Sequence, residues 1–476
     1  MLAEAQKSAG RSIPLLVASA YFMENLDGTV IVSALPTMAR SFHVTVADMS
    51  LGVSAYLMAL AVLIPASGWF VDRYGVRRIF TLAIAGFTLA SIACAASQNL
   101  HMFTLARLLQ GAAGALMVPV GRLAVLRSTP KQDLIDAIAT ITWPGLAAPV
   151  LGPPLGGFIV EHASWHWIFL LNLPLGIAAL LWARRILPPE EDAGGVFLAP
   201  PRPFDWPGFV LASTACVSVM AGMEWIGQGH NLAIGGVLLA IGVLAGVGAY
   251  VHGTRGNRPL LDPWALRLPT FATAVFSGTW FRASASSLPF LLPLLLQVGL
   301  GYNAFHSGLL VLMLFAGNLA MKPLTTPILH RFPFRTILLV NGSLTAAMFP
   351  ACAFIGSGTP IALSAVILFA AGAARSMQFT AYNTIAFADV PEDRMNASNT
   401  LFNTMVQLAM GMGIALGTLA LRLATSWSGH TGNPQLWDFR IALFLMGGFC
   451  LFSLVELLGL RKDAGDVVRV RESARA

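Results

Sequence analysis

The chain has 476 residues, of which 56% are hydrophobic and only 11% are charged. Soluble domains carry about 25% charged residues, so this composition excludes an ordinary soluble enzyme. The formal net charge of +7 does not indicate a nucleic-acid partner either, because the basic residues are scattered singly between apolar runs.

Apolar runs long enough to cross a bilayer, about 20 residues each, recur along the whole chain. They predict an all-α membrane protein with fourteen spans, at 13–35, 49–71, 78–97, 102–126, 134–160, 166–187, 206–226, 231–252, 269–297, 304–328, 335–356, 360–386, 396–424 and 439–460. The predicted domains are an N-terminal six-helix bundle (1–187), a cytoplasmic loop (188–205), an inserted transmembrane hairpin (206–252), a cytoplasmic linker (253–268), a C-terminal six-helix bundle (269–460) and a cytoplasmic tail (461–476).

The loops between these runs are unequal in basic charge. Lysine and arginine crowd the loops on one side, whereas the other side holds only Arg40 and Arg440. Cytoplasmic loops carry the excess of basic residues in membrane proteins. Because the number of spans is even, we expect both termini to lie in the cytoplasm.

Two carboxylates, Glu24 and Asp27, interrupt the first apolar run. On a helix they lie about 60° apart and about 4.5 Å along the axis, so they share one face. An ionised carboxylate in hydrocarbon costs several kcal/mol, so this face is expected to meet a partner or a water-filled cavity. The pair therefore indicates a proton-coupling site; the alternative is a structural ion pair with a basic residue of another helix.

The connection between the second and third runs contains a cluster of glycine and charge. Glycine lets two helices approach closely, and Asp72 can accept from an arginine or from a helix N-terminus of a neighbouring bundle. We interpret the cluster as a conformational latch that breaks when the inner side opens; the alternative is a plain basic loop. Its members are Gly68, Asp72, Arg73, Gly75, Arg77 and Arg78.

The fourth run carries Arg107 and, fifteen residues later, Arg122, which lies near the same helix face. A buried arginine needs a counter-charge, and Glu24 and Asp27 are the nearest acids in chain order. We expect Arg107 to alter the proton affinity of that pair as the helices shift. A static salt bridge is the alternative.

The fifth run is rich in proline and glycine. A helix of this composition is kinked and thin, which permits tight packing against a neighbour. Such a surface can pack against its neighbour without water between them and so prevent leakage through the transporter, although a purely structural packing role is the simpler interpretation. The predicted seam consists of Pro149, Gly152, Pro153, Gly156 and Gly157.

Three cations, Arg282, Lys322 and Arg375, lie in runs of the second half that contain no acid. This surplus of positive charge favours anionic or chelated substrates by Coulomb's law. Alternatively, these cations bond to backbone carbonyls or reach the membrane surface. The residues predicted to line a substrate cavity are Arg122, Gln110, Asn172, Arg282, Arg375, Gln378 and Asn403.

Several of these stretches resemble the signature motifs of drug:proton antiporters of the major facilitator superfamily. They are the cluster at 68–78, the R-x-x-Q-G-x-x-G that begins at Arg107 and the G-P-x-x-G-G that begins at Gly152. The stretches 26–36 and 165–176 are similar to motifs of the 14-span branch, with Ser33 in place of asparagine and His166 in place of arginine. Within that branch the chain resembles the MdtD-type multidrug exporters.

The resemblance implies a major facilitator fold in a bacterial inner membrane, with two six-helix bundles, an inserted two-helix hairpin and a central cavity that opens alternately to each side. It also implies that Asp27 is the proton site, that Arg107 modulates it, and that the fifth span is the seam specific to exporters.

We therefore expect a proton-coupled exporter of small drug-like molecules that acts as a monomer in the lipid bilayer. Its expected partners are protons and a small-molecule substrate, with no nucleic acid, no metal and no cofactor; the proton gradient supplies the energy. One alternative is an exporter of organic anions or metal chelates. A remoter one is a non-transporting receptor or scaffold. An enzyme is not expected, because the sequence shows neither a nucleophile–base pair nor a phosphate-binding loop.

Overall fold

The computed structural model describes residues 2–44, 46–130, 133–187, 203–227, 231–256, 259–302, 304–429 and 434–469. Within these ranges the chain is helical and contains no strand. The predicted loop 188–205 is described only from residue 203, and the predicted tail 461–476 only as far as residue 469.

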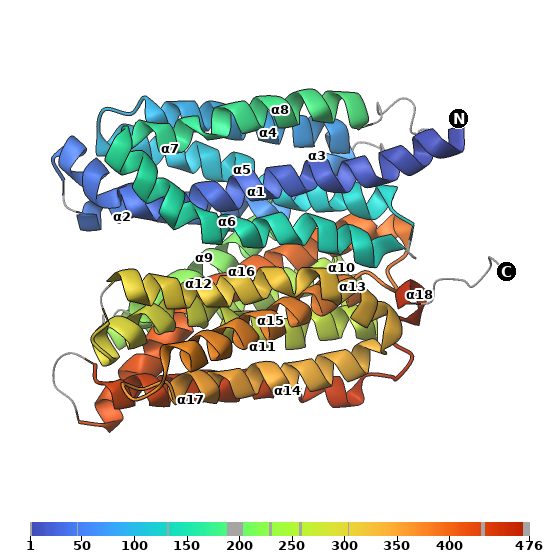
Figure 1. Cartoon of the computed structure of the whole chain (residues 1–476). Coiled ribbons are helices and arrows are strands. Elements are labelled where there is room, and N and C mark those ends of the chain that lie inside the picture. The colour runs from blue at the N-terminus through green and yellow to red at the C-terminus, as the bar shows by residue number, and fades with distance from the viewer. Residues whose placement is uncertain are drawn as a thin grey trace.

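The first helices pack into one bundle, drawn blue to green in the upper half of Figure 1. α1 packs along α6, and α5 packs against both α2 and α4. Gly75 joins α3 to α4 with a φ of +84°, a conformation that residues with a Cβ rarely adopt. The bundle consists of α1 (Leu2–Phe42), α2 (Val46–Leu63), the 3₁₀ turn η1 (Ile64–Ala66), α3 (Ser67–Tyr74), α4 (Val76–Ala95), α5 (Leu100–Ser128), α6 (Leu134–His162), α7 (His166–Leu170) and α8 (Asn172–Ile186).

The last helices form a second bundle, yellow to red in the lower half of Figure 1. α11 packs against α16, and α14 packs against α15 and α17. The predicted run 304–328 consists of two helices, α12 and α13, that meet at an angle of 43°. The elements are α11 (Pro269–Leu294), the π-helical turn η4 (Leu295–Gly299), α12 (Ala304–Ala320), α13 (Lys322–Arg331), α14 (Phe334–Ala353), α15 (Ile361–Ile385), η5 (Glu392–Arg394), α16 (Met395–Trp427), α17 (Leu436–Phe452), η6 (Glu456–Gly459) and α18 (Asp466–Arg469).

The number of membrane-crossing helices is consistent with the sequence pattern. Among the described residues, eleven helices are long and apolar enough to cross a membrane, or twelve if α12 and α13 form one span. The long helices α1 and α6 cover two further predicted spans, so the structure is consistent with fourteen. Large apolar side chains on the outer faces, such as Leu82, Leu89 and Val340, are 65–66% exposed, as a lipid-facing surface requires.

The hairpin of α9 (Trp206–Gly227) and α10 (Leu232–Arg255) contacts both bundles. α9 packs against α2 of the first bundle and against α16 of the second. On the first side, Ser213 Oγ donates to the carbonyl oxygen of Val62 at 2.9 Å. On the second side, Arg422 Nη1 donates to the carbonyl oxygen of Ile226 at 3.0 Å. The hairpin therefore bridges the two bundles along one flank.

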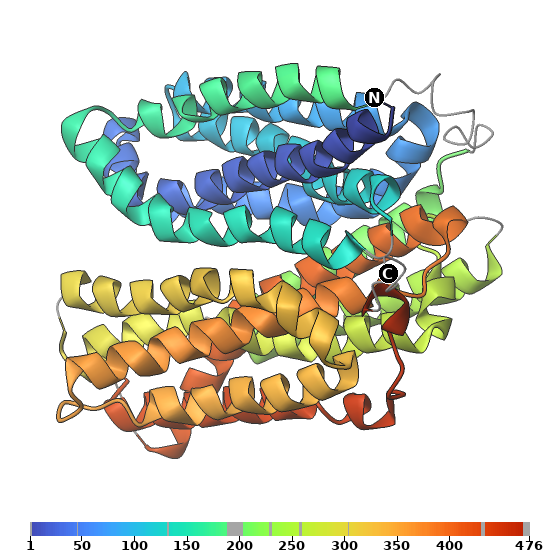
Figure 2. The same cartoon turned by 45° about the vertical axis from the view of Figure 1, so that its right-hand side comes forward.

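The two bundles lie one above the other, with α16 at the boundary between them (Figure 2). α16 packs against α3 and α5, and α6 packs against α12, α13 and α15. The beginning of α1 and the short α18 lie toward the same end of the molecule, which we call the termini side (Figure 1).

Candidate functional site

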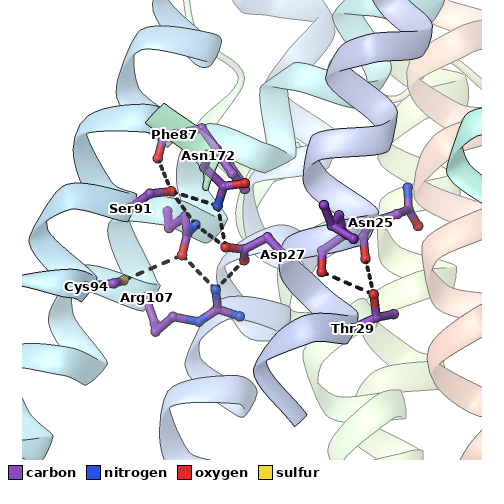
Figure 3. Close-up of polar contacts among 10 residues, drawn as sticks. Asn25, Asp27, Thr29, Phe87, Ser91, Cys94, Arg107 and Asn172 are labelled. Carbon is purple, nitrogen blue, oxygen red and sulfur yellow. Dashed lines mark hydrogen bonds and ion pairs between the residues drawn. The ribbon is translucent and has the colours of Figure 1, made fainter. Parts of the chain in front are cut away.

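The carboxylate of Asp27 is enclosed in the N-terminal bundle, where the side chain is 1% exposed. Three side chains donate hydrogen bonds to it (Figure 3). They are Arg107 Nη1 at 2.6 Å, Gln110 Nε2 at 2.9 Å and Asn172 Nδ2 at 2.7 Å. The first two lie on α5 and the third begins α8, so one carboxylate of α1 connects three helices.

A second layer of polar atoms holds these donors in place. Gln110 Oε1 accepts from Arg107 Nη1 at 2.6 Å, because the two residues lie nearly one turn apart on α5. Gln110 and Asn172 also donate to Ser91 Oγ of α4, at 2.8 and 3.2 Å. Each of these side chains is at most 1% exposed. A charge can be buried this completely only when it is paired and hydrogen-bonded, and this one is both.

Tyr56 of α2 covers the other side of the guanidinium group. Its ring centroid lies 4.3 Å from Arg107 Cζ, a cation–π contact. Gly111 permits this contact, because a Cβ at that position would collide with the backbone carbonyl oxygen of Tyr56. α2 and α5 therefore approach closely at this glycine.

Glu24 lies beside this cluster and is held differently. The Tyr56 hydroxyl donates to its carboxylate, and its charge interacts with that of Asp27. Its Oε2 atom is buried without a hydrogen-bond partner, and no basic group lies within 4.0 Å of it in the described part of the chain. Thus Asp27 has a cationic partner and Glu24 has a neutral one.

Two residues predicted to line a substrate cavity, Gln110 and Asn172, lie instead on the Asp27 carboxylate. Gln378 lies between α14 and α15, where its Nε2 donates to the carbonyl oxygen of Leu338 at 3.0 Å. Asn403 donates to the carbonyl oxygen of Asn399, one turn earlier in α16, at 2.7 Å.

The predicted cavity residue Arg375 is 7% exposed, and its Cζ lies 5.4 Å from the ring centroid of Phe379 on the same helix. Its Nε and Nη1 atoms are buried without acceptors.

The remaining two predicted cavity residues meet at the bundle boundary. Arg122 of α5 and Arg282 of α11 place their Cζ atoms 5.3 and 5.1 Å from the ring centroid of Phe402, on α16.

The predicted latch residues Gly68 and Asp72 contact the opposite bundle on the termini side. Asn396 Nδ2, in the first turn of α16, donates to the Gly68 carbonyl oxygen at 2.9 Å and to Asp72 Oδ1 at 2.5 Å. Arg127, which belongs to the same bundle as Asp72, places its Nη2 atom 4.0 Å from Asp72 Oδ1. Beside them, Asn399 Nδ2 donates to the carbonyl oxygen of Pro119 on α5 at 2.9 Å.

The arginines of the predicted latch lie elsewhere. Arg77 Nη2 donates to the carbonyl oxygen of Arg184 on α8, in its own bundle, at 2.7 Å. Arg73 and Arg78 are exposed. Gly75 forms the break between α3 and α4. The hydrogen bonds described across the junction come from the amides of Asn396 and Asn399.

The predicted seam on α6 faces α1 at Gly152, where a Cβ would collide with the Thr29 side chain. Gly156 is buried. The side chains of Pro149 and Pro153, and the surroundings of Gly157, lie outside the described part of the structure.

Several residues of these sites were not identified from the sequence. Tyr56, Ser91 and Phe402 lie in apolar runs, and nothing in their spacing distinguishes them from packing residues. Asn396 offered a signal, because Asn396, Asn399 and Asn403 recur at helical spacing and so form a polar face on α16.

Comparison with known proteins identifies relatives over most of the chain. The family model of the Major Facilitator Superfamily matches residues 17–414. The "Putative multidrug resistance protein MdtD" of Escherichia coli O45:K1 is 36% identical over 413 residues, which cover 86% of this chain and 85% of the relative. The protein of the same name in Escherichia fergusonii is 37% identical over the same shares of the two chains.

Two solved structures share the fold at low sequence identity. The human organic anion transporter MFSD10 (TETRAN) superimposes with a TM-score of 0.69 at 15% identity, over 94% of this chain and 99% of that one. The proton:xylose symporter XylE superimposes with a TM-score of 0.62 at 12% identity, over 97% of this chain and 98% of that one. The predicted fold class is confirmed.

Proposed function

Because the chain belongs to the major facilitator superfamily, it is a multi-pass transporter of the inner membrane and not an enzyme, and we propose that it exports small drug-like molecules in exchange for protons. The relatives named for multidrug resistance support the substrate class. The enclosed Asp27 carboxylate is the single observation that carries the proton coupling.

Proton binding at Asp27 removes the negative charge that neutralises Arg107. Breaking a buried pair in this way costs about 3–5 kcal/mol, because one charge is left uncompensated. The pair connects α1 to α5, so protonation changes the most stable arrangement of these helices. This change is the coupling step. One arrangement of the helices is favoured when Asp27 is ionised and paired with Arg107, and a different arrangement is favoured when Asp27 is protonated.

Glu24 is the second group that binds a proton in this mechanism. Burying a carboxyl group without a cationic partner costs less free energy when the group is the neutral acid than when it is ionised. The Tyr56 hydroxyl touches Glu24, and the Tyr56 ring lies against Arg107. Tyr56 therefore lies between the two acids, where its rotation can connect them as the helices shift.

The junction of Asn396 with Gly68 and Asp72 closes the cavity on the termini side, which we assign to the cytoplasm from the basic loops. Opening toward the cytoplasm separates α16 from α3 and α5. The transporter works as a monomer and without a cofactor, with the proton gradient as its energy source.

The test is transport by purified protein in liposomes with an imposed pH gradient. The substrate panel contains ethidium, norfloxacin and salicylate, which are a cation, a zwitterion and an anion. Asp27→Asn is expected to abolish gradient-driven transport of every substrate that the native protein moves. Asp438→Asn is the matched control, because Asp438 is equally buried but caps α17. Undiminished transport by Asp27→Asn, or no transport by the native protein, contradicts the proposal.

A second candidate is the export of organic anions or metal chelates, favoured by the buried cations of the C-terminal bundle. Arg375→Ala should then reduce transport of salicylate and leave transport of ethidium unchanged. The opposite pattern would count against this candidate.

A further inference from the structure

One buried and one half-buried arginine, from opposite bundles, contact one aromatic ring. Arg122 belongs to α5 of the N-terminal bundle, and Arg282 belongs to α11 of the C-terminal bundle. Their Cζ atoms lie 5.3 and 5.1 Å from the ring centroid of Phe402. The two positive charges are close enough to repel each other. Like charges at a boundary oppose its closure, so this boundary needs a compensating charge.

Each guanidinium group is positioned by neutral partners that leave part of it unused. Arg282 is 1% exposed and donates to the carbonyl oxygen of Ala274 and to Asn383 Oδ1, both at 3.1 Å. Its Nε atom is buried without an acceptor. Arg122 donates to the Tyr21 hydroxyl, which is itself fixed by a 2.7 Å bond to the carbonyl oxygen of Val118.

Neither cation has a carboxylate partner among the described residues. Nη1 of Arg122 is buried without an acceptor. In the ranges that the structure describes, no carboxylate lies within 4.0 Å of Arg122 or Arg282. The buried carboxylate of Asp27 is bonded to Arg107. Buried N–H groups without acceptors are costly, so this arrangement is suited to an acceptor that comes from outside the chain.

We propose that Arg122 and Arg282 form an anion-binding site for the carboxylate group of a substrate. The planar guanidinium groups match a carboxylate, and the fully buried Phe402 ring that both contact brings them together. This assignment rests on the proposed transport function and names the chemical class of its substrate as organic carboxylates.

The position of the site links binding to the junction on the termini side. Arg122 follows Pro119 by three residues on α5, and Phe402 follows Asn399 by three residues on α16. Three residues correspond to about 4.5 Å along a helix, and α5 and α16 run in opposite directions, so Arg122 lies on one side of the Asn399–Pro119 contact and Phe402 on the other. A carboxylate between the arginines holds the bundles together here, and separation of the bundles divides its site.

The experiment measures equilibrium binding of radiolabelled salicylate to the purified full-length protein in detergent at neutral pH. Arg122→Gln and Arg282→Gln should each weaken binding at least about tenfold, because each removes a hydrogen-bonded charge from the carboxylate. Arg122→Lys and Arg282→Lys should recover part of the loss. Tetraphenylphosphonium, an aromatic cation without a carboxylate, should bind these variants no more weakly than the native protein.

Lys322→Gln is the matched control, because it also removes one buried positive charge. Lys322 lies apart from Phe402, with its Nζ 2.7 Å from Thr380 Oγ1. Salicylate binding that survives both arginine variants, or that falls equally in Lys322→Gln, overturns the anion site. Intact binding without gradient-driven transport would instead refute the proposed function and leave the site standing. Gradient-driven transport of ethidium with no salicylate binding would refute the site alone.

Discussion

In the N-terminal bundle the buried Arg107 lies 2.6 Å from a carboxylate, whereas the partners of the buried cations of the C-terminal bundle, within the described part of the chain, are neutral. Lys322 donates to a threonine hydroxyl, and Arg282 donates to an amide and a carbonyl. The difference indicates that the two bundles have different roles in transport. A paired charge can be switched by one proton, whereas Arg282, whose Nε atom is buried without an acceptor, can receive an anion.

The largest effect on stability is expected from Arg107→Leu. It leaves the Asp27 carboxylate buried with two amides and no cation, so the free energy of unfolding should fall by about 3 kcal/mol or more. Thermal unfolding in detergent measures this. A melting temperature equal to that of the native protein would show that the pair contributes nothing.

The same replacement in the other bundle, Arg375→Leu, should have the opposite sign or none. Arg375 has two buried nitrogen atoms without acceptors, and exchanging such a group for an apolar side chain is neutral or stabilising by about 1 kcal/mol. Destabilisation as large as that of Arg107→Leu would remove the contrast between the bundles.

The neutral donors to Asp27 should be needed for coupled transport. Asn172→Leu removes one of the three hydrogen bonds that hold the carboxylate against Arg107, so gradient-driven transport should fall about tenfold. Asn341→Leu is the control, because Asn341 is bonded to Gln378 in the C-terminal bundle. An equal loss of transport in both variants would contradict this role.

The junction on the termini side should weaken when its amide is removed. Asn396→Ala deletes the bonds to Gly68 and Asp72, each worth about 1 kcal/mol, so the closed arrangement becomes less populated. A cysteine that replaces Thr400, which is 1% exposed and faces Gly68 across the junction, should react faster with a membrane-impermeant maleimide in the Asn396→Ala variant than in the native background. A cysteine at Ala112 on α5 should react at the same rate in both backgrounds. Unchanged reactivity at Thr400 would show that the amide does not hold the junction.

A carboxylate outside the membrane should give the smallest effect and serves as a reference for both bundles. Asp205 is partly buried, which raises its pKa, but donors from Leu260, Gly208 and His252 outweigh burial and lower the pKa below the ordinary value. Its stabilisation is therefore complete above the unfolded pKa of about 3.9 and is lost as the pH falls through the lower folded value.

Asp205→Asn should accordingly lower the free energy of unfolding by about 1 kcal/mol at pH 7, and the deficit should shrink below about pH 3.9. Asp393→Asn, at a side chain that is 77% exposed, should have no measurable effect. A deficit that grows on acidification would contradict the assigned sign.

The Asp27–Arg107 pair was predictable from the sequence, because few acids and arginines lie inside the first four spans and they must neutralise one another. The partners of Gln110 and Asn172 were not, because a neutral amide carries no charge whose partner can be inferred, and its contacts depend on helix rotation. The Asn396–Gly68 contact joins residues that are 328 positions apart, so it required the crossing of α3 and α16 to be known.

Proton release on substrate binding tests the central claim most directly. Purified protein in lightly buffered detergent solution, with a pH indicator dye, is mixed with a substrate that it transports. The native protein should release protons as substrate binds, and Asp27→Asn should bind the same substrate with no release from that site. Equal proton release by Asp27→Asn and the native protein would contradict the account, because the proton exchanged in transport would then belong to another group.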